Sequence, residues 1–427
     1  MLKKSFFGLT QPWLKYEKFL EPPKRIRQIP LPDTVTYFFN TPFEKTTDLK
    51  LNIGDLVNRG EPIVLKGEPG GTQVGTSTGT VAAIAPYTGD LGRRYTAVTV
   101  KVTDKEMRDN GFAACTESPD IESMRAYLAG APGNPPLDRL VDPEKPIDTI
   151  VIDAMDNDIL IGTRQYILKT NFPSVIKGID ILRRVTDIDR IVMVVPRESF
   201  QGYGHIGAEV LAADLKYPAG NPYLIVSNLL KKESPSGQSF EDIGVCFFSI
   251  EAVASMGRAY TEGSVPDNKI ITFIDKMGAR SLASVRVGTP VADVLSAYGV
   301  TLNDRDRLIF GGPMTGRSVY DVEHPILADT DAVFVQDRES IPYASDYPCI
   351  NCGDCIRVCP VNIPIDMLVR FLEAGLFQEA ADQYALEACI ECGLCSYVCV
   401  SKIPIFQYIR LGKYELSRER LAEAAND

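Results

Sequence analysis

Eight cysteines near the end of the chain carry the most specific chemical pattern in the sequence. They form two copies of Cys-x2-Cys-x2-Cys-x3-Cys, the first within residues 349–359 and the second within 389–399. In proteins that hold two iron–sulfur clusters with this pattern, the fourth cysteine of each run binds the other cluster, because it points away from the first three. The sequence therefore predicts two 4Fe–4S clusters. The ligands of the first are Cys349, Cys352, Cys355 and Cys399, and those of the second are Cys389, Cys392, Cys395 and Cys359.

Small residues flank these cysteines. Gly353 and Gly393 follow the second cysteine of each run, where a bulky side chain would crowd a cluster. Pro360 follows the first run, and Val400 stands where a second proline is expected, without removing a ligand. Zinc ribbons also use Cys-x2-Cys pairs, but they need four cysteines in two pairs and leave none over. Disulfides are disfavoured because the eight cysteines are crowded and no secretory signal precedes them.

The overall composition limits the partners of the protein. A chain of 427 residues is long enough for roughly two to four domains. Its net charge of −11 argues against direct binding to nucleic acid or to an anionic bilayer. No apolar run reaches the length of a membrane span. The remaining cysteines, Cys115 and Cys246, and the two histidines, His205 and His324, show no catalytic pattern, and we expect them to be structural.

The elements that position the cysteines come from segments of different composition, so the predicted fold class is a multidomain chain with α+β and α/β parts. Residues 1–30 form an aromatic N-terminal arm, which either packs on the body or docks on a partner protein. Residues 31–105 resemble a biotinyl- or lipoyl-type barrel-sandwich domain without the lysine that would carry a swinging arm. An α/β domain at 106–265, a small β-rich domain at 266–340 and the cluster domain at 341–427 follow.

The α/β segment predicts a βαβ unit. Short apolar runs at 148–155 and 190–199 are typical of buried parallel strands, and the apolar spacing within 172–187 predicts a helix between them. Further on, Thr289 and Pro290 predict a capped helix start. Residues 364–388 have helical periodicity between the cysteine runs. A charged terminal helix follows, whose basic residues are either solvated or a docking face for an acidic partner: Arg410, Lys413, Arg418 and Arg420.

With these segments in order, the chain resembles the C subunit of the Rnf electron-transport complex, over nearly its whole length. The segments that carry the resemblance are VRVGTPVADVL, GGPMTG and IPIFQYIRLGK, together with the two cysteine runs. The resemblance implies a Rossmann-like, flavin-type α/β domain and an SLBB-like β-grasp domain ahead of a two-cluster ferredoxin-type domain. It also implies electron transfer between NADH or ferredoxin and membrane subunits that pump ions.

The resemblance further implies an FMN and NADH site in the α/β domain, built around Gly130, Gly133, Asp156, Asp158 and Lys216. The glycine-rich loop of the family is altered here, since residues 130–136 read GAPGNPP. Proline removes backbone N–H donors that a flavin phosphate needs, so the sequence supports the clusters better than this site. FMN is therefore expected only if the altered loop still binds it.

Three functional hypotheses follow. The first is an electron-transfer subunit of an Rnf-like complex, peripheral on the cytoplasmic side of the cell membrane, relaying electrons through both clusters between a soluble donor and membrane subunits. The second is a soluble NADH- and flavin-dependent reductase similar to cobalamin reductases. The third is a non-catalytic scaffold with structural clusters. NADH dehydrogenase activity of its own depends on the flavin site.

Overall fold

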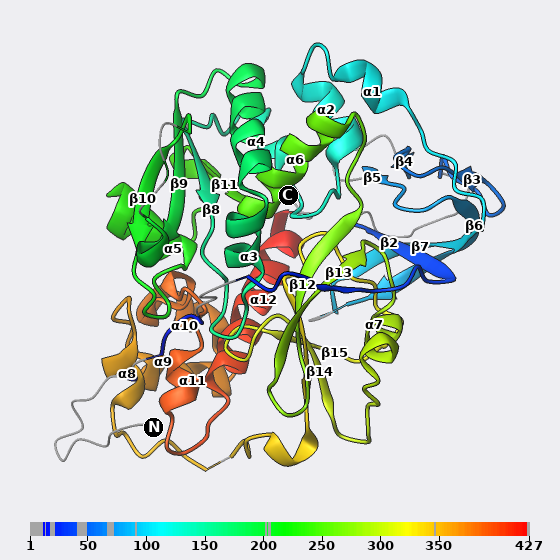
Figure 1. The fold of residues 1–427 in the computed structure, drawn as a ribbon. Helices are drawn as coiled ribbons and strands as arrows, with labels where there is room; N and C mark the ends of the chain where they lie inside the picture. Colours follow the sequence, from blue (N-terminus) through cyan, green and yellow to red (C-terminus); the bar gives the residue numbers. More distant parts are fainter. Residues whose placement is uncertain are drawn as a thin grey trace.

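The computed structural model describes residues 12, 14–17, 22–40, 49–65, 72–89, 92–200, 203, 206–345 and 347–424. Strands and helices together form a mixed α/β body, and the helices that carry the cysteines lie together at one end of it (Figure 1). Among the helices described, none is long and apolar enough to cross a membrane.

The first sheet is antiparallel and has the order β2-β7-β6-β3. Side chains of β7 alternate between buried and partly buried positions, as expected for a sheet with one face in a core. A register shift between Val81 and Ala83 interrupts the β6–β7 pairing. The strands are β2 (Thr34–Phe39), β3 (Leu56–Val57), β6 (Gly79–Thr88) and β7 (Arg94–Val102), with β4 (Pro62–Val64) paired to β5 (Thr72–Val74) beside them.

The second sheet is parallel throughout, with the order β10-β9-β8-β11. The predicted βαβ unit is present, and both predicted strands are almost entirely buried. The chain runs from β8 outward to β10 and then returns to the other side of β8. The strand order thus reverses between β8 and β11, where open α/β sheets bind ligands beyond their carboxyl ends. The strands are β8 (Thr149–Asp153), β9 (Arg190–Pro196), β10 (Glu209–Ala213) and β11 (Val245–Ser249).

Helices cover both faces of this sheet. On one face α4 and α6 pack closely, because Gly178 and Gly257 have no side chain between them: a Cβ at Gly257 would lie 1.9 Å from the Ser174 carbonyl oxygen. A short helix and a π-helix, α5 and η5, lie on the other face (Figure 1). The helices of this region are α1 (Gly111–Cys115), α2 (Ile121–Leu128), α3 (Thr163–Thr170), α4 (Phe172–Val185), α5 (Pro222–Leu224), η5 (Ile225–Leu230) and α6 (Ile250–Glu262).

The third sheet is mixed and has the order β1-β13-β12-β16-β14-β15. Its helix α7 begins after Pro290, but the predicted threonine cap is wrong: Thr289 is fully buried, and its hydroxyl makes no hydrogen bond within the described structure. Part of the predicted N-terminal arm, β1, pairs with β13 at the sheet edge. The elements are β1 (Arg27–Gln28), β12 (Asn268–Ile274), β13 (Arg280–Arg286), α7 (Val291–Tyr298), β14 (Arg307–Phe310), β15 (Arg317–Val319) and β16 (Ala332–Gln336).

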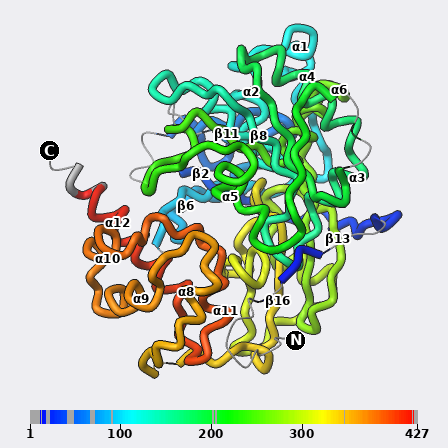
Figure 2. The backbone as a smooth tube through the Cα atoms, turned by 90° about the vertical axis from the view of Figure 1, so that its left-hand side faces the viewer, coloured from blue at the N-terminus to red at the C-terminus, as the bar shows by residue number. Residues whose placement is uncertain are grey.

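The C-terminal region is helical, and its helices lie together on one side of the molecule (Figure 2). The predicted helix over 364–388 is two helices, because Gly375 adopts a φ of +72° and ends the first of them. The terminal helix packs inward through Ile409 and Leu416. The helices are α8 (Asp354–Val358), α9 (Ile365–Glu373), α10 (Phe377–Tyr384), α11 (Leu394–Val398) and α12 (Ile405–Ala424).

Candidate cluster-binding sites

The two cysteine runs fold as structural repeats. In each run the residue before the second cysteine has a positive φ, as Asn351 (+55°) and Glu391 (+52°) show. The glycine after that cysteine has a φ of +72° in both runs and stands directly before a short helix, α8 or α11. Positive φ is the conformation that glycine adopts without strain, so the backbone itself requires Gly353 and Gly393. A Cβ at Gly393 would also lie 2.5 Å from the Met314 carbonyl oxygen.

The first predicted ligand set comes together at one cavity. Cys349, Cys352 and Cys355 line it from the first run, and Cys399 lines it from the second. Apolar side chains complete the wall, including Ile365 and Ile403. Cys399 thus lines the same cavity as the cysteines with which the spacing predicts it to share a cluster.

The second predicted ligand set is more deeply placed. Cys389, Cys392 and Cys395 are each less than a tenth exposed. Burial, with a smaller contribution from the nearby Cys389 and Cys359, raises the pKa of the Cys392 thiol to about 12. Cys359 therefore lies beside the second run, although it belongs to the first.

The donors fit two iron–sulfur clusters: each set holds four sulfurs in a mostly apolar surrounding. Within the described ranges no three His, Cys, Asp or Glu side chains are arranged to hold a single metal ion. The ligands of a cubane bind separate irons, so they need not converge in that way. The assignment of each cysteine to one cluster stays a prediction.

Basic residues of the terminal helix are mostly paired within the protein. Lys413 bonds to Glu391 and to the Cys389 carbonyl, and Arg420 bonds to Glu387. These contacts join α12 to the second cysteine run and neutralise much of the basic face that the sequence suggested for docking. They favour a structural role for the helix.

The structure places two of the residues predicted for FMN and NADH, Lys216 and Asp156, beside the N-terminal segment 14–17. Lys216 pairs with Lys15 in an antiparallel bridge, and the Tyr16 hydroxyl accepts a hydrogen bond from the Gly220 amide (3.1 Å). Tyr16 is 3% exposed and packs against Tyr217 with a ring-centroid distance of 5.4 Å. The segment fills the space beside the carboxyl end of β8.

Asp156 lies beneath this segment and is completely enclosed. Its carboxylate accepts hydrogen bonds from the Arg164 amide (2.8 Å) and from Gln165 Nε2 (2.7 Å), and the same Gln165 amide donates to the Glu17 carbonyl. Burial raises the pKa of Asp156 to about 7, against the opposing effect of these hydrogen bonds. Its donors are protein groups, and it is not available as a ligand for a nucleotide.

Asp158 supports a turn instead of a cofactor. Its carboxylate accepts hydrogen bonds from the amides of Met314 (2.9 Å) and Thr315 (2.8 Å) and from the Thr315 hydroxyl (3.0 Å). Gly312 lies against it so closely that a Cβ there would be 2.4 Å from its carboxyl carbon. The GGPMTG segment, whose role the sequence did not disclose, is thus held by Asp158 next to the second cysteine run.

The two loop glycines are also occupied by protein contacts. Gly133 lies against the start of α6, where a Cβ would be 2.1 Å from the Ala252 amide nitrogen, and its carbonyl accepts from the Ser249 hydroxyl. A Cβ at Gly130 would meet the side chain of Gln73 at 2.2 Å. The loop therefore packs against the N-terminus of α6, whose free amide groups a flavin phosphate would need as hydrogen-bond donors.

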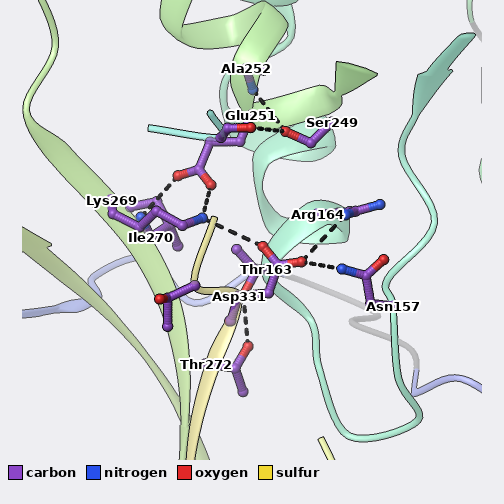
Figure 3. A network of polar contacts seen from close by, with 12 residues as sticks. Asn157, Thr163, Arg164, Ser249, Glu251, Ala252, Lys269, Ile270, Thr272 and Asp331 are labelled. Atoms are coloured by element: carbon purple, nitrogen blue, oxygen red, sulfur yellow. Dashed lines mark hydrogen bonds and ion pairs between the residues drawn. The ribbon is translucent and has the colours of Figure 1, made fainter. Parts of the chain in front are cut away.

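A network of buried ion pairs lies next to these residues, near the carboxyl end of β8 (Figure 3). Lys269 forms ion pairs with Glu251 and, at 3.4 Å, with Asp331. Arg164 pairs with Asp153 (2.5 Å) and with Asp331 (3.4 Å). Burial acts to lower the pKa of Lys269, but the two carboxylates outweigh it and raise the pKa.

The residues predicted for FMN therefore do not fit that cofactor, because protein groups already satisfy the two carboxylates and cover both glycines. Sequence reasoning missed the residues that close this edge. Tyr16 lies in an arm of mixed composition, and Lys269 is a charged residue at the start of an apolar strand. Lysine is almost never fully buried unless it is paired, so a lysine in an apolar strand is a local sequence signal of a buried ion pair.

Replacing Tyr16 tests how firmly the N-terminal segment closes the edge. We expect Tyr16→Ala to lower the free energy of unfolding by about 3 kcal/mol, because a fully packed ring is lost. Tyr16→Phe should cost only about 1 kcal/mol, for the hydrogen bond from Gly220. Urea unfolding followed by circular dichroism measures both, with Tyr343→Ala as the control because that ring is 73% exposed. If Tyr16→Ala unfolds like the control, the segment does not close the edge.

The fold and the two cysteine sets define the class of the protein: a mixed α/β multidomain chain with an iron–sulfur module at its C-terminus. A family model described as a 4Fe-4S dicluster domain matches residues 341–400. A chain of an NAD+-reducing [NiFe]-hydrogenase, in the H2-reduced state, superimposes loosely, with a TM-score of 0.44 at 13% identity over 70% of this chain and 64% of that one.

Curated relatives name the particular protein that the chain resembles. They include proteins of Buchnera aphidicola (24% identical over 380 residues) and of Pasteurella multocida (27% over 366), which cover 84% and 80% of this chain. A third, of Pseudomonas aeruginosa, is 27% identical over 339 residues and covers 73%. All three are named as the C subunit of an ion-translocating oxidoreductase complex, so the resemblance to the C subunit of the Rnf complex is confirmed. The chain spans 79% of the Buchnera protein but only 43% of the other two.

Proposed function

We propose that this chain is an electron-transfer subunit of an Rnf-like, membrane-associated ion-translocating complex. The observation that carries the proposal is that Cys399 of the second run lines one cavity with Cys349, Cys352 and Cys355 of the first, which supports two cluster sites joined in one unit. Clusters held in this way carry single electrons, and the protein sets their burial and hydrogen bonding. The name of the curated relatives supports the assembly into a complex.

The two cluster sites differ in their access to a partner. Cys352 is exposed, whereas the first three cysteines of the second run are buried. Large apolar side chains around the first site are exposed: Tyr347 by 72%, Ile350 by 65% and Val400 by 52%. Exposed apolar groups of this kind mark protein interaction sites. We name this surface, with the neighbouring cations Arg370 and Lys402, the cluster face.

The charge of the cluster face indicates an acidic redox partner. Arg370 donates to the Asn351 side chain, next to Cys352, and Lys402 is exposed just after Cys399. The chain as a whole carries a net charge of −11 and repels acidic proteins elsewhere, so a local basic patch would orient them. A ferredoxin-like donor or an acidic face of another protein in the complex has this chemistry.

The finer fold assignments support the same function. In this proposal, residues 31–105 are a barrel-sandwich domain, 106–265 a Rossmann-like domain, 266–340 an SLBB-like β-grasp domain and 341–427 the ferredoxin-type domain. The closed edge of the parallel sheet favours a structural role for the Rossmann-like domain. Electrons would therefore arrive from a redox protein, without NADH or FMN as intermediate carriers. A peripheral position on the cytoplasmic side of the membrane agrees with the reduced thiols that cluster ligands require.

The proposal is tested with the holoprotein, purified without oxygen and assayed for iron and flavin. We expect about eight irons per chain, no flavin, bleaching of the cluster absorbance by dithionite, and no response to NADH. One flavin per chain with bleaching by NADH would instead support the soluble reductase hypothesis. Clusters that stay unreduced at low potential would support the scaffold hypothesis.

A further inference from the structure

A cavity of about 330 Å³ lies between the first and third sheets and reaches Asn157, which stands between the predicted cofactor residues Asp156 and Asp158. Aromatic side chains from distant parts of the chain form its walls: Phe38 from β2, Tyr87 from β6, Phe310 from β14, and Tyr320 and His324 from the segment after β15. Its volume lies within the range of small-molecule sites.

The aromatic rings form one connected arrangement. Phe38 contacts Tyr87 with a centroid distance of 4.5 Å and His324 with a centroid distance of 5.2 Å. Tyr87 and Tyr320 are nearly parallel, with 11° between their planes and 6.2 Å between their centroids. His324 is oriented through Nδ1, which donates to the Pro325 carbonyl because that oxygen can only accept. The walls therefore have fixed orientations.

Tyr320 is exposed yet anchored. Its side chain is 77% exposed, but its hydroxyl donates to the Thr88 carbonyl across the two sheets (2.9 Å). Nearby, the Tyr87 hydroxyl is buried and lies close to Tyr320, but it makes no hydrogen bond of good geometry within the described residues. A buried hydroxyl without a partner is costly, so it is an independent sign that something else supplies the hydrogen bond.

Hydrogen-bond acceptors lie among the cavity's polar lining residues. Asn157 and Asp331 line the cavity, and the Asn157 amide nitrogen donates to the Asp331 carboxylate (2.6 Å). That bond uses the donor side of Asn157 and leaves its carbonyl oxygen as an acceptor. Asp331 is fixed in place by the ion network of Figure 3 through Lys269 and Arg164. Protein groups satisfy both oxygens of Asp331, so the acceptor that the lining presents to an N–H group of a ligand is the Asn157 carbonyl oxygen.

We propose that this cavity binds a planar nitrogen heterocycle of nucleoside size, stacked on the aromatic walls with its amino edge toward the Asn157 carbonyl oxygen. Aromatic side chains stack on any nucleobase, and amide oxygens accept from the amino groups of adenine and guanine. The site goes beyond the electron relay and does not depend on it, since binding involves no electron transfer.

Titration of the holoprotein with adenosine and with guanosine tests the site, with ribose as the control that lacks the ring. Isothermal calorimetry gives the affinity, and saturation-transfer NMR reports contact with the base protons. We expect a nucleoside to bind and ribose not to bind. Tyr320→Ala should weaken binding about tenfold, because one stacking face is removed.

The matched control is Tyr343→Ala, since Tyr343 is exposed to a similar extent (73%) and does not line the cavity. It should bind as the unmodified protein does. Tyr87→Phe, which removes the buried hydroxyl, provides a second variant with little risk to folding, and it should also weaken binding. The proposal is overturned if neither nucleoside binds at millimolar concentration, or if Tyr320→Ala binds as tightly as the control. Iron content, measured on the same samples, separates either result from a failure of the cluster sites.

Discussion

Replacing Cys349 and Cys352 together with serine should abolish the first cluster and leave about four irons per chain, all in the second. The exchange of the fourth cysteine then makes two opposite predictions in this double variant. Adding Cys399→Ser should cost no further iron, because its cluster is already lost. Adding Cys359→Ser should deplete the remaining cluster, because Cys359 is predicted to be its fourth ligand.

Iron analysis and the cluster absorbance of the two triple variants measure this directly. The variants form a matched pair, since each removes one more thiol of the same position in a cysteine run. Circular dichroism controls for folding, because most of the cysteines pack in or against the core of the C-terminal region. If Cys399→Ser costs iron and Cys359→Ser does not, each run holds its own cluster and the proposed exchange is wrong.

Reversing charge on the cluster face should slow electron transfer from an acidic ferredoxin. We expect Arg370→Glu combined with Lys402→Glu to lower the second-order rate constant at least about tenfold at low salt, because attraction becomes repulsion near the exposed site. Reduction by dithionite should be unchanged, since that small reductant does not need a docking surface. Stopped-flow absorbance measures both rates, and calorimetry with the oxidised ferredoxin measures binding without electron transfer.

Two control variants add negative charge on other surfaces. Arg305→Glu reverses a charge on a side chain that is 84% exposed, and Met277→Asp changes an apolar residue that is 93% exposed. Neither should alter the ferredoxin rate beyond the small effect of net charge. The salt dependence provides a further check, because screening should weaken the unmodified pair and help the charge-reversed one. Equal rates for all variants would mean that the ferredoxin transfers its electron at another surface of the protein.

The sequence by itself determined the chemistry at the C-terminus. Cysteine spacing follows directly from how a short loop and one helical turn can reach a cluster, so it is visible without tertiary structure. The buried parallel strands and the helix at 172–187 were predicted for a similar reason: their apolar patterns are local. The break at Gly375 was not predicted, because a single glycine inside a helical pattern is compatible with either one helix or two.

Only the tertiary structure decided what lies at the edge of the parallel sheet. Gly130, Gly133, Asp156, Asp158 and Lys216 have residue types that suit a cofactor, but their partners come from positions far away in the sequence. Tyr16 meets Gly220, and Asp158 meets Thr315, across distances in sequence that no local pattern records. The aromatic cavity has the same origin, since Tyr87 and Tyr320 meet only where two sheets pack together. Long-range contacts therefore determine which polar groups remain available to a ligand, whereas spacing alone determines which cysteines are predicted to share a cluster.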